Sequence, residues 1–263
     1  MVDDWETLSL VFFDVETTGL NPHQGDAICE IGAVKLKNEE IIDKFQTLVN
    51  PKRKIPPHVS SIHNIYDEDV KDAPCFEKVI DSFLAFLKDS IIAGYNICFD
   101  LSFLNKELAK MGYPSLNMPA LDVLKMAKRT LNLKYYNLGY LTQYLKIKAE
   151  RYHRALEDAY LTSQVFLKIR NILYEKGVRK MEEIILLFGV ESFSYKKIQQ
   201  PLLTLFKESI EERIRVKVRY FSSSGVKEYT FFPLKVVENT VFGRDREGGL
   251  SLKLNQILDV EVL

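Results

Sequence analysis

One stretch near the amino terminus decides the fold of this chain: Leu10-Val11-Phe12-Phe13-Asp14-Val15-Glu16-Thr17-Thr18-Gly19-Leu20. The unbroken apolar run before Asp14 is typical of a buried β-strand. Side chains alternate between the faces of a strand, so Asp14 and Glu16 point the same way, roughly 6.6 Å apart along the backbone. Burying two unpaired carboxylates costs free energy. A hard divalent cation such as Mg2+ or Mn2+ relieves that cost. The alternative is a solvent-facing, acidic end of a strand.

Length and composition set broad limits. A chain of 263 residues with 46% hydrophobic residues fits one large domain or two smaller ones. The 36 basic and 36 acidic residues give a net charge of zero, so overall charge does not indicate a polyanionic partner. The three cysteines have no metal-like spacing, which favours a reducing compartment. The acidic segment Met1–Glu6 lacks the apolar core of a signal peptide, and no run reaches about 18 apolar residues. We therefore expect a soluble, cytoplasmic protein that does not contact a membrane.

The first two thirds of the chain alternate between strand and helix patterns. We expect strands over 9–16, 27–36, 41–49 and 90–94, and helices over 75–87, 99–111, 119–131, 137–146 and 154–175. Interleaved strands and helices indicate an α/β architecture.

After residue 176 the pattern changes. We interpret residues 177–198, with a short helical run over 181–188, as a linker between a first domain (1–176) and a second one (199–263). For the second domain we expect a helix over 201–210 and strands over 214–221, 227–232, 234–242 and 251–262. The second domain is therefore predicted to be small and β-rich.

Two further groups of polar residues stand at the ends of predicted elements. Asn96 and Asp100 follow the short strand 90–94, and open α/β sheets bind ligands at such strand ends. Asp100 could instead be a plain helix N-terminal acid. His153 and Asp158 are five residues apart, which turns an α-helix by about 140°. The two can share a site only if His153 precedes the regular helix; otherwise they are ordinary surface residues.

Taken together, these motifs resemble those of the DEDDh, or DnaQ-like, 3′–5′ exonuclease family. The resemblance rests on the stretch Phe13–Leu20, on Asn96-x-x-Phe99-Asp100 and on His153-x-Ala155-x-x-Asp158, and it covers about residues 8–175. Between them, Ile62-His63-Asn64-Ile65 is similar to an Ile-His-Gly-Ile segment of that family, with asparagine in place of glycine.

The resemblance implies a ribonuclease-H-like mixed sheet, flanked by helices, that holds two divalent cations, Mg2+ or Mn2+. It implies that Asp14 contacts both cations, that Glu16 and Asp158 hold the one that activates water, and that Asp100 supports the other. His153 would orient or deprotonate that water. The terminal nucleotide would be contacted by five residues, Thr17, Leu20, His63, Asn96 and Phe103. The product would be a nucleoside 5′-monophosphate released from a 3′ end.

The second domain, 199–263, resembles a WYL-like module, a class associated with nucleic-acid or nucleotide sensing. The Trp-Tyr-Leu triplet itself is absent, and Thr240-Val241-Phe242 stands in its vicinity. Alternate positions along one strand carry basic residues, Arg213, Arg215, Lys217 and Arg219. Such a stripe suits contacts with backbone phosphates, and it equally suits an exposed edge strand protected by charge.

Three functions remain in competition. The leading one is an exonuclease that degrades single-stranded DNA or DNA 3′ ends, with the second domain as a candidate contact for nucleic acid or protein. An exoribonuclease of the same fold is a close variant, because the motifs do not separate DNA from RNA. A non-catalytic nucleic-acid-sensing protein is the contrasting class. The presence of all four carboxylates and His153 disfavours it, since such groups are costly to bury without a purpose.

Overall fold

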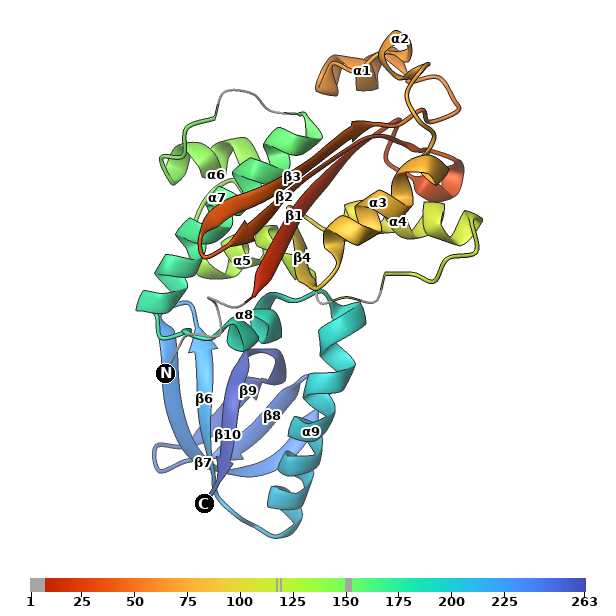
Figure 1. Ribbon diagram of the computed structural model, residues 1–263. Coiled ribbons are helices and arrows are strands. Elements are labelled where there is room, and N and C mark those ends of the chain that lie inside the picture. The colour runs from red at the N-terminus through yellow and green to blue at the C-terminus, as the bar shows by residue number, and fades with distance from the viewer. Residues whose placement is uncertain (1–7, 117, 119, 150–152) are drawn as a thin grey trace.

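The structure is a computed structural model that describes residues 8–116, 118, 120–149 and 153–263, with the backbone alone for 191–200 (Figure 1). The segment Met1–Glu6, for which we expect no signal peptide, lies outside the described residues. Among the residues that are described, no helix combines the length and the apolar character needed to cross a bilayer.

The first sheet is mixed and carries the decisive stretch at its centre. Its order is β3-β2-β1-β4-β5. The strands are β1 (Ser9–Thr17), β2 (Ile28–Lys37), β3 (Glu40–Leu48), β4 (Ser90–Gly94) and β5 (Ala120–Asp122). β1 runs antiparallel to β2 and parallel to β4. The predicted α/β class with a mixed sheet is confirmed.

Helices cover both faces of this sheet (Figure 1). They are α1 (Pro57–His63), α2 (Asp67–Val70), α3 (Phe76–Leu87), α4 (Cys98–Lys110), α5 (Val123–Thr130), α6 (Leu138–Tyr144) and α7 (Ala155–Glu175). On one face Phe12 of β1 packs against Phe166 of α7, with ring centroids 5.2 Å apart. On the other face Phe13 packs against Phe83 of α3 at 5.6 Å. Asp14 and Glu16 follow Phe12 at intervals of two residues along β1. Their side chains therefore lie on the same face of the sheet as Phe12, which is the face that α7 covers.

The second sheet is antiparallel and has the order β10-β6-β7-β8-β9. Its strands are β6 (Val216–Ser222), β7 (Gly225–Val237), β8 (Thr240–Arg244), β9 (Gly249–Lys253) and β10 (Ile257–Val262). Helix α9 (Glu191–Glu211) packs against it and places Phe206 in its core. The predicted second β-rich unit is therefore present. Most of the segment interpreted as a linker is helical, in α8 (Met181–Phe188) and the start of α9.

Three of the expected elements differ from the structure. The helix expected over 119–131 begins with strand β5, because three residues are too few to show a period. The chain stays in one strand, β7, on both sides of Pro233, since a shift of register between Pro233 and Lys235 accommodates the proline. The strand expected over 234–242 therefore divides between the end of β7 and the start of β8. The strand expected over 251–262 is interrupted by a 3-10 turn, Leu254–Gln256.

The two sheets are joined through α8 and the end of α7. Phe188 of α8 lies edge-on to Phe221 of β6, with ring centroids 6.1 Å apart. Glu183 of α8 accepts a 2.7 Å hydrogen bond from Arg219 of β6. Figure 1 shows the second sheet beyond the end of the first sheet at which β1 begins. The acidic residues of β1 lie toward the opposite end of that strand, so the second sheet is remote from them.

The predicted basic stripe of the second sheet is largely engaged within the protein. Arg219 is bound to Glu183, and Lys217 forms a 3.0 Å ion pair with Glu228 on the neighbouring strand. Arg215 lies over the ring of Phe232 at 5.8 Å. Two members of the stripe are therefore paired with carboxylates on a neighbouring strand and on α8, and contact of the stripe with backbone phosphates stays a prediction.

Candidate metal-binding active site

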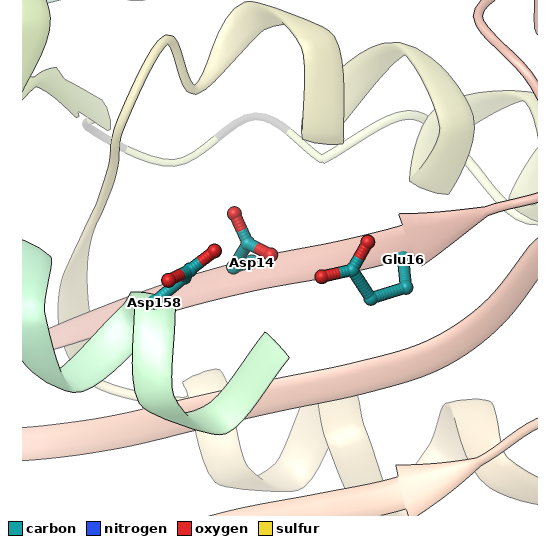
Figure 2. Close-up of side chains that lie close together, drawn as sticks. All are labelled: Asp14, Glu16 and Asp158. Carbon is teal, nitrogen blue, oxygen red and sulfur yellow. The ribbon is translucent and has the colours of Figure 1, made fainter. Parts of the chain in front are cut away.

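Three carboxylates from two elements gather at one point above the sheet. Asp14 and Glu16 come from β1, and Asp158 comes from the first turn of α7. Each offers a carboxylate oxygen that lies within 4.8 Å of those of the other two. Figure 2 shows the three side chains turned toward one another, with Asp14 between Asp158 and Glu16. All three are partly buried, so water screens their mutual repulsion only in part.

Burial and mutual repulsion favour the protonated forms of these three carboxyl groups. Burial, followed by repulsion from Asp100 and Glu16, raises the pKa of Asp14 well above its usual value. Burial and the nearby Asp158 raise the pKa of Glu16 to about 8. Burial likewise raises the pKa of Asp158 to about 6, although a hydrogen bond from the His153 backbone opposes it. A cluster that resists ionisation in this way is one that a divalent cation would stabilise.

A second observation fits a cation. The Oδ1 atom of Asp158 is buried and, within the described part of the chain, receives no hydrogen bond. Its Oδ2 atom accepts a hydrogen bond of 3.1 Å from the backbone N–H of His153. Hard cations such as Mg2+ and Mn2+ prefer carboxylate oxygens as ligands, and a buried oxygen without a hydrogen bond can serve as one. Asp14, Glu16 and Asp158 are therefore suited to hold the metal.

Cation binding should depend on pH in a defined direction. Carboxylates must lose their protons to bind a cation, so affinity should rise as the pH increases from about 6 to 8 through the raised pKa values of Asp158 and Glu16. We expect Mn2+ to raise the Tm of the protein more at pH 8 than at pH 6, as measured by scanning calorimetry. Without metal, by contrast, these three carboxyl groups should make the protein less stable at pH 8 than at pH 6. These groups destabilise the fold most above their folded pKa, and that destabilisation is lost as the pH falls toward their unfolded pKa. A Mn2+-induced rise in Tm that is equal at both pH values would contradict the assignment.

Asp100 lies beside this cluster but is held by the backbone. It sits in the first turn of α4, is almost fully buried, and its Oδ1 accepts a 3.0 Å hydrogen bond from the Val15 N–H. Burial raises its pKa to about 8, although that hydrogen bond opposes the rise. The structure thus fixes Asp100 against β1 between Asp14 and Glu16. It does not belong to the group of three whose oxygens lie within 4.8 Å.

His153 stands just outside the helix that carries Asp158. Helix α7 begins at Ala155, and His153 has a left-handed backbone with φ of 61°. The prediction that His153 precedes the regular helix is confirmed, and Arg151 and Tyr152 before it lie outside the described residues. Its side chain is exposed and lines the same cavity as the three carboxylates. An imidazole at this place can exchange protons with solvent and with a bound molecule.

The sequence interpretation missed Glu30, which holds the start of helix α7 and thereby helps to position Asp158. Glu30 of β2 lies opposite Glu16 and is 0% exposed. It accepts hydrogen bonds from Arg154 Nε at 3.0 Å, from Arg154 Nη2 at 2.7 Å and from the Ala155 N–H at 3.1 Å. Burial raises the pKa of Glu30, but these bonds and one from Gln46 outweigh it and hold the pKa below its usual value. An acidic residue inside the apolar run Ile28–Ile31 was the available signal.

Gly32 leaves room for the first residues of α7 next to β2. It lies opposite Asp14 on β2, and a Cβ at this position would collide with the backbone of Ala155 and Leu156. Glycine therefore lets the start of α7 approach the sheet closely, while Glu30 fixes its first residues. His153 and Asp158 take their positions from this contact.

Replacing Glu30 by glutamine tests this support. The variant keeps the shape of the side chain but loses the charge that binds Arg154, so the start of α7 should loosen and carry Asp158 with it. We expect the affinity for Mn2+ to fall about 10-fold to 100-fold, as measured by isothermal titration calorimetry. Glu40→Gln, at an exposed position of β3, is the matched control. Equal Mn2+ affinity in Glu30→Gln and wild type would show that Glu30 does not position the site.

A cavity of about 670 Å3 opens over the cluster, and most of the predicted substrate-binding residues line it. Thr17, Leu20, His63 and Asn96 line it, and Leu20 is 84% exposed at its rim. His63 is buried, which lowers its pKa, and its Nδ1 accepts a 3.0 Å hydrogen bond from the Ile65 N–H. The volume lies in the range of ligand pockets, about 300–1,000 Å3.

Phe103 is the one predicted site residue that the structure places elsewhere. It is 0% exposed and belongs to the core between α4 and the sheet. Phe99, one turn earlier in α4, lines the cavity instead and packs on Phe103 with ring centroids 5.0 Å apart. The contact with substrate that we expected of Phe103 is thus available to Phe99. The helical phase of α4 turns position 103 toward the sheet.

The sequence of this chain is similar to parts of PolC-type DNA polymerases. The chain is 39% identical over 175 residues to the DNA polymerase III PolC-type of Caldanaerobacter subterraneus subsp. tengcongensis, with 66% of this chain and 12% of that protein covered. It is 31% identical over 247 residues to the PolC-type polymerase of Staphylococcus haemolyticus, with 93% and 17% covered. The chain thus spans less than a fifth of the length of these relatives.

Solved structures share the fold. Exonuclease X in complex with 5′ overhanging duplex DNA superimposes with a TM-score of 0.52 at 26% identity, covering 68% of this chain and 99% of that one. Exonuclease I of E. coli with a dA16 oligonucleotide gives a TM-score of 0.59 at 16% identity, covering 90% and 55%. The second of these likenesses concerns the fold alone.

The family model described as RNase_T, exonuclease, matches residues 11–166. That range begins in β1 and ends within α7, so it contains all three clustered carboxylates as well as Asp100 and His153. The chain therefore belongs to the RNase_T exonuclease family.

Proposed function

We propose that this chain is a metal-dependent 3′–5′ exonuclease that releases nucleoside 5′-monophosphates from single-stranded DNA or DNA 3′ ends. The observation that carries the proposal is the cluster of Asp14, Glu16 and Asp158 at the floor of a cavity wide enough for a terminal nucleotide. Membership of an exonuclease family supports the reaction type. The identity to PolC-type DNA polymerases supports DNA as the substrate.

Two divalent cations, Mg2+ or Mn2+, would be held by Asp14, Glu16 and Asp158, with Asp100 in support of one of them. When bound, such cations polarise the phosphate and make water more acidic. In the hydrolysis, the oxygen of an attacking water forms a bond to the last phosphorus, and the bond from phosphorus to the preceding 3′ oxygen breaks. The departing 3′ oxygen takes up a proton from solvent, so the shortened strand ends in a 3′ hydroxyl, and the mononucleotide leaves with its phosphate on the 5′ oxygen.

The residues of the chain have separate parts in this reaction. His153, exposed at the cavity wall, accepts the proton of the attacking water and passes it to solvent. The ring of Phe99 and the exposed side chain of Leu20 offer apolar surface to the terminal base.

We retain 1–176 and 199–263 as the proposed domain boundaries, with the second domain as a WYL-like module. Its role is separate from the reaction, because its sheet lies beyond the far end of β1 (Figure 1). A β-rich unit packed on α9 supports the assignment of a module with its own core.

The substrate class is tested by digesting matched DNA and RNA strands of one sequence with Mg2+, with Mn2+ and with chelator. We expect DNA to be shortened from its 3′ end with either cation, RNA to be shortened more slowly, and neither strand to change in chelator. Faster digestion of RNA would assign an exoribonuclease. Binding of both strands without cleavage under any condition would assign a sensing protein.

A further inference from the structure

A basic stretch of the chain without a single acidic residue adjoins the active site. Between Asp122 and Glu150, six basic residues and no Asp or Glu occur, whereas the average composition would place roughly four acidic residues there. The basic residues are Lys125, Lys128, Arg129, Lys134, Lys146 and Lys148. A chain with zero net charge thus concentrates positive charge in one segment, which comprises α5, α6 and the loop between them.

The basic residues of this segment divide into two classes. Lys125 and Arg129 point inward and bind the backbone oxygens of Gly189 and Leu187 at 2.9 and 2.6 Å, so they hold α8. Lys128, Lys134, Lys146 and Lys148 are exposed. In the described residues, none of these four forms an ion pair with a carboxylate. Their charge is therefore available to an anionic partner.

Tyrosine rings stand among the exposed lysines. Tyr135 is 50% exposed, and its ring lies edge-on to Tyr140 with centroids 5.6 Å apart. Lys134 Nζ lies 5.1 Å from the centroid of the Tyr135 ring. Tyr144, 53% exposed, follows Tyr140 by four residues on α6 and so shares its face. Exposed aromatic rings next to cations form the surface on which single-stranded nucleic acid binds, by stacking of bases and neutralisation of phosphates.

The loop that carries Tyr135 is held by hydrogen bonds, both within itself and to the wall of the active-site cavity. The Tyr136 hydroxyl donates to the Leu131 carbonyl at 2.9 Å and accepts from the Leu133 N–H at 3.0 Å, which closes the loop on itself. The Tyr95 hydroxyl in turn donates to the Tyr136 carbonyl. Because Tyr95 also lines the cavity, this hydrogen bond connects the loop of Tyr135 with the cavity wall.

From this arrangement we infer that Lys134, Tyr135, Tyr140 and Tyr144, named here the tyrosine surface, bind the single strand whose 3′ end occupies the cavity. A base several nucleotides from the end stacks on the Tyr135 ring, and Lys134 neutralises a neighbouring phosphate. The inference rests on the proposed function and adds the path of the strand to it. The second sheet does not supply that path, since it lies beyond the opposite end of β1 (Figure 1).

The test compares long and short strands on the full chain. Binding of fluorescein-labelled dT20 and of dT3 is measured by fluorescence anisotropy in chelator, so that no strand is cut. We expect Tyr135→Ala to raise the Kd for dT20 about 5-fold to 100-fold and to leave the Kd for dT3 unchanged, because only the longer strand reaches the tyrosine surface. Tyr135→Phe keeps the ring and should bind dT20 as the wild type does.

A matched control and a salt titration sharpen the test. Tyr174 on α7 is also 50% exposed and also has a cation over its ring, Arg179 at 5.3 Å, so Tyr174→Ala should leave both affinities unchanged. Lys134→Gln should reduce the slope of log Kd against log salt by about 0.7 for dT20. Equal dT20 binding by Tyr135→Ala and wild type would overturn the inference while the proposed function stands. A wild type that neither binds nor cleaves any strand would overturn both.

Discussion

Replacing Asp14 by alanine should abolish exonuclease activity, with a loss of about three orders of magnitude or more. Asp14 lies between Glu16 and Asp158 in the cluster (Figure 2). Without its carboxylate, the two that remain are not joined by a central ligand and should hold a cation poorly. Stabilisation of transition-state charge by a bound cation is worth several kcal/mol, and about 4 kcal/mol corresponds to a factor of about 1,000 in rate. The rate of shortening of a 3′-labelled strand in Mn2+ measures this loss.

The same substitution should not weaken the fold in the absence of metal. Asp14 is a partly buried carboxyl group whose pKa is raised, so it destabilises the folded state at pH values above the usual pKa of an aspartate. We expect the metal-free Asp14→Ala protein to have a Tm at pH 8 equal to or higher than that of the wild type. Asp43→Ala, at an exposed position of β3, is the control and should keep both activity and Tm. An active Asp14→Ala protein would contradict the assignment of the site.

Replacing His153 by asparagine should lower the rate about 100-fold to 10,000-fold while leaving the affinity for Mn2+ nearly unchanged. Asparagine tolerates the left-handed backbone that His153 adopts, so the loop should keep its shape. Asp158 is bound by the backbone N–H of residue 153, which the substitution retains. The change therefore removes the proton acceptor alone. Single-turnover rates and titration calorimetry with Mn2+ separate the two effects.

His23→Asn is the matched control for this prediction. His23 is exposed in the short 3-10 helix after β1 and does not line the cavity. It should keep full activity. Loss of Mn2+ binding in His153→Asn would show that the side chain holds the metal rather than a proton. An unchanged rate would remove His153 from the reaction.

Two pairs within the candidate metal site could be predicted from the sequence because the residues of each pair are close along the chain. The alternation of a strand puts Asp14 and Glu16 on one face, and the position of His153 before a helix brings its backbone to Asp158. These relations span two and five residues. The resemblance to an exonuclease family then joined three separate motifs into one site. The predicted α/β class with a mixed sheet followed from the same elements.

The supporting residues could not be predicted, because they depend on contacts between distant segments. Glu30 and Arg154 are 124 residues apart, and no local pattern pairs them. That Phe99 rather than Phe103 lines the cavity depends on the rotation of α4 about its axis, which the packing of Phe103 into the core decides. The partners of Lys217 and Arg219 likewise come from a neighbouring strand and from α8. In each case tertiary packing decides what the local pattern leaves open.

The most direct test of the account is to identify the first product that the full chain releases from a single-stranded DNA labelled at its 3′ end, in the presence of Mn2+. The acidic cluster and the cavity predict that the label appears first as a nucleoside 5′-monophosphate, while a 5′ label on the same strand stays on fragments that shorten one nucleotide at a time. Release of internal fragments, or of mononucleotides from the 5′ end, would contradict the assignment of a 3′–5′ exonuclease.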